Sequence, residues 1–69
     1  MAIFETAQRY YEIALEKGLF GEWILTRYWG GKGTSRFGQK SQWVESFELG
    51  LIEADTIKAI RIKRGYRPS

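Results

Sequence analysis

The sequence predicts an α+β fold, a small antiparallel β-sheet of three or more strands packed by one C-terminal helix. Two runs near the start of the chain, residues 9–17 and 22–29, alternate apolar and polar side chains as half-buried strands do. Turns rich in glycine follow both runs, and from residue 46 the spacing changes to the three and four of a helix. A chain of 69 residues has room for one domain.

Residues 1–8 are expected to form an N-terminal arm, because MAIFETAQ shows no clear period. Within this arm, Ile3 and Phe4 are the side chains expected to pack onto the body. Residues 9–69 are expected to form the single domain.

The first expected strand is RYYEIALEK, residues 9–17, with Tyr11, Ile13 and Leu15 on one face. After the turn GLFG at 18–21, the run EWILTRYW at 22–29 is rich in β-forming residues and also alternates, so the two strands should form an antiparallel hairpin. GGKGTS, residues 30–35, is expected to be a loop. A third extended segment covers roughly 36–45.

The helix is expected to begin after its cap, Ser46, and to end before Gly65. Gly65 suits the first position beyond a helix, Tyr66 can fold back as the hydrophobic contact of that ending, and Pro68 prevents continuation. The stripe that should lie on the sheet recurs at spacings of three and four: Phe47, Gly50, Ala54, Ile57, Arg61 and Arg64.

Two features of this helix leave alternatives open. Gly50 is tolerable if a small residue is needed where helix and sheet approach closely, but the helix could equally begin near Leu51. Ile60 and Ile62 lie about 200° apart around a helix, so one of them should be exposed or should contact something else.

Composition excludes several classes of activity. The chain contains neither Cys nor His, so it has no disulfide, no thiolate or imidazole metal ligand, and no Cys or His nucleophile. Its carboxylates show no spacing that demands acid and base catalysis. We therefore expect a protein that is not an enzyme and that needs neither metal nor cofactor. No apolar run exceeds four residues, so neither a signal peptide nor a membrane span is expected, and the expected location is cytoplasmic.

The net charge of +3 is unevenly distributed. Residues 56–69 contain basic side chains and no acidic ones, whereas the acidic residues outnumber the basic ones in the remainder. This asymmetry favours a polyanionic partner, although a solubilising basic helix end would produce the same pattern.

Five short motifs stand in a familiar order. They are RYY at the start of the first strand, GLFGEW at the first turn, LTRYWGG at the end of the second strand, GQ at 38–39, and KRGY at the end of the helix. Together they resemble the WGR domain, a module of poly(ADP-ribose) polymerases and of small bacterial proteins that is named for a Trp-Gly-Arg tripeptide. The resemblance runs from Arg9 to Tyr66.

The resemblance implies an antiparallel sheet packed by one helix and, in the polymerases, a nucleic-acid contact near a DNA end. The family's tryptophan and glycine correspond to Trp29 and Gly30, but Gly31 stands where the family has arginine. The loop GGKGTSRFGQ is also longer than the family's usual spacing. Polymerase activity is not implied, because a catalytic domain does not fit in this chain.

The predicted nucleic-acid site has three components. Trp29 would stack on a base or sugar, although it could instead be a core residue. Gly30 and Gly31 would allow close backbone approach, although they could simply form a flexible hairpin. The basic residues expected to contact phosphates are Arg27, Lys32, Arg36, Lys63 and Arg64, and the alternatives for them are solvation and interaction with the helix dipole.

The sequence therefore predicts a stand-alone, non-catalytic module that binds nucleic acid, with DNA as the expected partner and without sequence preference. The alternative is a protein-interaction or regulatory module that uses an exposed patch of Tyr28, Trp29 and the surplus helical Ile. A monomer or a weak homodimer is expected.

Overall fold

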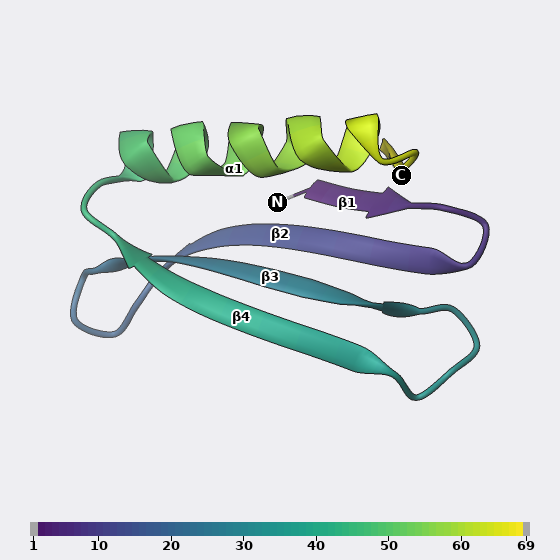
Figure 1. Ribbon diagram of the computed structural model, residues 1–69. Coiled ribbons are helices and arrows are strands. Elements are labelled where there is room, and N and C mark those ends of the chain that lie inside the picture. The colour runs from purple at the N-terminus through teal and green to yellow at the C-terminus, as the bar shows by residue number, and fades with distance from the viewer. Residues whose placement is uncertain (1, 69) are drawn as a thin grey trace.

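The computed structural model describes residues 2–68 and contains a five-stranded antiparallel sheet packed by one helix (Figure 1). The sheet order is β4-β3-β2-β1-β5. Met1 and Ser69, the ends of the expected arm and domain, lie outside the described residues. The predicted α+β class is confirmed. The elements in chain order are β1 (Ala2–Glu5), β2 (Arg9–Lys17), β3 (Trp23–Gly31), β4 (Phe37–Val44), α1 (Phe47–Lys63) and β5 (Arg67–Pro68).

The two faces of the sheet follow the predicted alternation. Tyr11, Ile13 and Leu25 lie on the face that α1 packs, where they join Ala54 and Ile57 of the helix in one buried cluster. The other face, which we call the open face, carries the alternate residues of each strand. Because directly opposed residues of antiparallel strands share a face, the register assigns every strand position to one face or the other.

The N-terminal residues differ from the expected arm, because Ala2–Glu5 form strand β1 between β2 and β5. Phe4 is buried opposite Tyr11, while Ile3 points to the open face and stays exposed. Four residues are too few to show a period, so this strand exists through its pairing with β2 rather than through a local pattern. The two-residue β5, opposite β1, has the same origin.

The second strand is longer than expected, since β3 continues through Gly30 and Gly31. A Cβ at Gly30 would come within 2.6 Å of the Arg36 carbonyl oxygen and 2.8 Å of the Tyr10 hydroxyl. Glycine is therefore needed inside the strand, because Tyr10 of β2 and the backbone just before β4 both approach it closely. The connecting loop begins only at Lys32.

Both helix ends are confirmed. The Ser46 hydroxyl accepts a hydrogen bond from the Leu49 N–H at 3.1 Å, which satisfies one of the free donors of the first turn. At the other end Gly65 has a φ of +93°, and its N–H donates to the Ile62 carbonyl while the Tyr66 N–H donates to the Arg61 carbonyl. This is a Schellman ending, and it turns the chain back toward β1.

The stripe of the helix is buried only in its middle, at Gly50, Ala54 and Ile57. A Cβ at Gly50 would lie 2.7 Å from a Leu15 methyl carbon, so the close approach of helix and sheet is the correct reading of that glycine. Ile60 and Ile62 are both exposed.

The molecule has two distinct ends along the strands (Figure 1). The end of α1, the β1–β2 connection and the β3–β4 loop lie at one of them. The β2–β3 turn and the start of α1 lie at the other. Segments that are far apart in the sequence therefore meet at the first end, next to Trp29.

Candidate functional site

Trp29 lies on the helix-packed face of β3 but beyond the part that the helix covers. Its indole stacks on Tyr11 of β2, with ring centroids 6.1 Å apart and planes 14° from parallel. On the β4 side the indole lies over Gly38, where any Cβ would overlap its Cε2, Nε1 and Cζ2 atoms. The tryptophan is held on two sides and still exposes 37% of its surface. It is neither a fully buried core residue nor a freely mobile one.

Arg61 of α1 also contacts the ring of Tyr11. Its guanidinium carbon is 4.3 Å from the centroid of the Tyr11 ring and 5.6 Å from that of Tyr66. The two tyrosines meet edge to face at 6.2 Å. Tyr11 thus contacts both Arg61 and Trp29. Its cation–π contact with Arg61 stabilises the position of a guanidinium that would otherwise be flexible.

The Nε atom of Arg61 is buried and makes no hydrogen bond within residues 2–68. A buried donor without an acceptor is unusual in a folded protein, because it has lost water and gained nothing in return. The half-buried guanidinium is therefore fixed by ring stacking rather than by a carboxylate, and its charge is not neutralised.

These residues line a concave site with a volume of about 660 Å³. That volume lies within the range of pockets that hold small organic groups. Arginines come from four different segments: β2, β3, the β3–β4 loop and α1. The lining residues are Gln8, Arg9, Tyr11, Arg27, Trp29, Gly30, Gly31, Thr34, Arg36, Phe37, Arg61 and Tyr66.

The site is strongly basic. Among residues 2–68 the ion pairs are Lys32 with Glu5 at 3.1 Å and Lys58 with Asp55 at 3.8 Å, and neither involves an arginine of the site. Four arginines therefore line the same cavity as one partly exposed indole, and none of the four forms an ion pair within residues 2–68. This arrangement can hold an anion beside a flat, stackable group.

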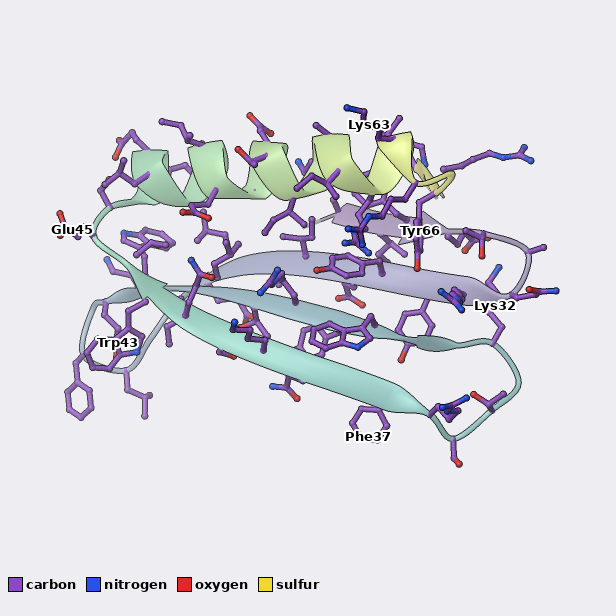
Figure 2. All side chains as sticks on the ribbon, viewed as in Figure 1. Lys32, Phe37, Trp43, Glu45, Lys63 and Tyr66 are labelled. Atoms are coloured by element: carbon purple, nitrogen blue, oxygen red, sulfur yellow. The ribbon has the colours of Figure 1, made fainter. Side chains whose placement is uncertain are left out.

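The structure brings five of the predicted site residues to this cavity: Arg27, Trp29, Gly30, Gly31 and Arg36. Lys32 instead pairs with Glu5 and lines a second, smaller cavity. Lys63 and Arg64 are exposed at the end of α1 and line neither cavity. Figure 2 shows Lys63 on the outer side of the helix and Tyr66 on the side toward the sheet.

Packing within the β3–β4 hairpin explains why Gly31, like Gly30, is glycine. The Gly31 N–H donates to the Arg36 carbonyl at 3.2 Å, so it is already used within the hairpin. A Cβ at Gly31 would lie 2.8 Å from the Thr34 hydroxyl. The glycine on which the Trp29 ring lies is Gly38, on the neighbouring strand.

Sequence reasoning missed Arg9, Tyr11, Gly38, Arg61 and Tyr66 as parts of the site. One signal was available for Arg61, since it is a charged residue in the stripe that should face the sheet, and such a residue needs a reason to be there. Arg9 could have been found from its register, because it lies directly opposite Gly31 once β2 and β3 are paired. The contribution of Tyr66 depends on the turn after the helix.

The apolar patch considered as the alternative site does not form as one surface. Tyr28 and Trp29 are adjacent in β3 and therefore lie on opposite faces of the sheet. Tyr28 lies opposite Gln39 on the open face, whereas Trp29 lies opposite Gly38 on the helix-packed face.

Residues 2–68 contain no group of three or more Asp, Glu, His or Cys side chains placed to bind a metal ion. Over the same range, no helix has both the length and the apolar character needed to cross a membrane.

Comparison with known proteins agrees with the resemblance that the motifs indicate. The WGR domain family matches residues 2–69. The chain is also similar to the uncharacterized protein y4dW of Sinorhizobium fredii, with 39% identity over 66 aligned residues. That alignment covers 87% of this chain and 29% of the relative, so the chain spans less than a third of the relative's length. No solved structure matches the chain.

Proposed function

Because this chain belongs to the WGR domain family, whose members are known as nucleic-acid-binding modules, we propose that it binds nucleic acid through the cavity around Trp29. The role is non-catalytic. The expected ligand is DNA, bound without sequence preference, at a position where one base or sugar is open to stacking. These features make binding at a strand end or at an unpaired segment more favourable than binding along an intact duplex.

The observation that carries this proposal is the partly exposed indole of Trp29 within a ring of arginines that have no carboxylate partners among residues 2–68. Stacking of one base on an aromatic ring contributes about 1–3 kcal/mol and does not depend on the base. The arginines supply the complementary term, because each neutralised phosphate releases counterions from the nucleic acid.

The roles of the basic residues differ with their positions. Arg9, Arg27, Arg36 and Arg61 line the cavity and are the proposed phosphate contacts. Lys63 and Arg64, which lie outside it, would add long-range attraction. Lys32 is paired with Glu5 and would contribute least. The guanidinium that the family motif places at position 31 is thus replaced by arginines from other strands and from the helix.

Fluorescence anisotropy with labelled blunt duplex, 5′-overhang duplex and single strand tests this proposal. If four phosphates are neutralised, affinity should fall about 10²-fold between about 50 and 200 mM salt. Trp29→Ala should weaken binding about 5- to 150-fold, the equivalent of one lost stacking contact.

Trp43→Ala is the matched control, because Trp43 is also an exposed tryptophan. It lies near the end of β4 that is remote from Gly38 and the cavity (Figure 2). It should leave the affinity unchanged. Absence of binding by the wild type at low salt, or equal losses in the two variants, would contradict the proposal. Circular dichroism establishes that both variants are folded.

The cytoplasmic location and the stand-alone role stay predictions. They are tested separately, by fractionation of the native protein and by the length of the chain in its cells.

A further inference from the structure

The two edges of the sheet are unlike each other. One edge is β5, which has two residues and contains Pro68, and a short strand with proline is poorly suited to further pairing. The other edge is β4, which has eight residues and no proline. An edge of this length exposes a row of backbone donors and acceptors that another strand can use.

The pairing of β4 with β3 uses the backbone N–H and C=O groups of every second residue of β4 and leaves the others free to pair with another strand. The Gly31 N–H donates to the Arg36 carbonyl, which places the 31–36 pair among those that bond to each other. Bonded and non-bonded pairs alternate along an antiparallel ladder, and Gly30 lies opposite Phe37 in the register. The N–H and C=O groups that point away from β3 are therefore those of Phe37, Gln39, Ser41 and Trp43.

This set of residues is self-complementary in the antiparallel direction. When a second β4 is placed beside the first with Lys40 on the twofold axis, Phe37 lies opposite Trp43 of the second copy, and Gln39 lies opposite its Ser41. The backbone N–H and C=O groups of all four residues point away from β3, so both pairs can exchange backbone hydrogen bonds. Their side chains share the open face, and the two helices then lie on the same side of a continuous sheet.

The most exposed aromatic side chains of β4 are the ones that this register joins. Phe37 is 76% exposed and Trp43 is 79% exposed, and they lie at opposite ends of the strand (Figure 2). In a single copy neither has an aromatic neighbour among the ring contacts of residues 2–68. Directly opposed aromatic residues on one face are among the stabilising cross-strand pairs of antiparallel sheets.

In this register Arg36 of one copy lies opposite Val44 of the other, so the paired segment extends beyond both aromatic positions. We propose that β4 pairs with β4 of a second copy of this chain, antiparallel and about a twofold axis at Lys40, to form a homodimer through the open edge of the sheet.

One feature opposes the dimer and makes it weak. At the axis the two Lys40 side chains face each other, and like charges directly opposite one another are unfavourable. A pairing of one short strand is also small compared with the roughly 1,200 Å² or more that stable interfaces bury. Association should therefore be visible only at high protein concentration, and it should strengthen with salt, which screens the two ammonium groups.

Cysteine cross-linking tests the register directly, because the chain contains no native Cys. Residues opposed in a non-bonded pair have Cα atoms about 4.5 Å apart, which is within the range of disulfides. Lys40→Cys should therefore form a disulfide dimer on mild oxidation, at least about tenfold faster than Lys63→Cys on the exposed side of the helix. Adding Trp43→Ser to Lys40→Cys should remove this advantage.

Ser41→Cys distinguishes the alternative register, in which the axis passes through Ser41 and Gln39 lies opposite Trp43. Faster cross-linking at position 41 than at 40 would overturn the proposed axis. Equal rates for Lys40→Cys and Lys63→Cys would overturn edge pairing altogether.

Sedimentation equilibrium of the wild-type protein, and of variants without an introduced cysteine, is the second measurement. The dimer fraction should increase with concentration and with salt, increase several-fold in Lys40→Thr, and fall to zero in Phe37→Ser and Trp43→Ser. Both aromatic positions are exposed, so the folding of these variants is verified by circular dichroism. A wild type that is monomeric at about 1 mM, or a dimer that survives Trp43→Ser, would overturn the proposal.

Discussion

Gly38→Ala should displace Trp29 from the candidate site. A Cβ at position 38 would overlap three atoms of the indole, whose opposite side is stacked on Tyr11. Gly38 does not have a positive φ, so alanine fits the backbone and the substitution reports on the indole contact alone. The ring has to move because the β3–β4 ladder holds Gly38 directly opposite Trp29.

The magnitude follows from this overlap. Adding a carbon to a well-packed position costs about 1–3 kcal/mol. In a domain of this size each kcal/mol lowers the melting temperature by about 4–8 °C. In a Trp29→Ala background the overlap is gone, and alanine should then stabilise the strand by about 0.5–1 kcal/mol relative to glycine. The sign of the effect therefore reverses between the two backgrounds.

The assay is a double-mutant cycle of urea unfolding for wild type, Gly38→Ala, Trp29→Ala and the double variant, followed by circular dichroism. Anisotropy with the overhang duplex should show that Gly38→Ala loses about as much affinity as Trp29→Ala. If Gly38→Ala has the same effect on stability in both backgrounds, the indole does not lie on Gly38 and the packing described for the site is wrong.

Three further outcomes are expected. Arg61→Met keeps an apolar stem over Tyr11 but removes a proposed phosphate contact. The slope of log affinity against log salt concentration should therefore become shallower by about 1, whereas Lys63→Met should change this slope less. Equal slopes in the two variants would contradict the assignment of Arg61. Ser46→Ala removes the bond to the Leu49 N–H and should destabilise the protein by about 0.5–2 kcal/mol in urea unfolding, with recovery in Ser46→Asp. Gly65→Ala forces a side chain into a φ of +93° and should cost about 1–2 kcal/mol, and no loss would mean that the helix ends differently.

The arginines near Trp29 come from positions other than that of the arginine in the family motif. Position 31 is glycine, and the residue directly across from it on the helix-packed side is Arg9. Arg36 and Arg61 reach the same cavity from the loop and the helix. The cavity therefore contains arginine side chains although position 31 is glycine.

Several elements could be predicted from the sequence because local chemistry specifies them. The strand at 9–17 follows from alternation, and the helix boundaries follow from a capping hydroxyl at Ser46 and a glycine at 65. Trp29 could be selected as a candidate because it matches the tryptophan of the family motif and precedes a glycine-rich stretch. The strand and helix predictions need only neighbours within a few positions along the chain.

Other features depend on which segments meet, and that is decided by the tertiary structure. Strand β1 exists because Phe4 lies opposite Tyr11, and Lys32 lines a different cavity from Trp29 because it pairs with Glu5 of β1. Arg61 becomes part of the site because α1 crosses the sheet above Tyr11. The sequence determined the elements and their ends through short-range hydrogen bonding and periodicity. The site was decided by strand register and helix position, because these set the distances between residues that are remote along the chain.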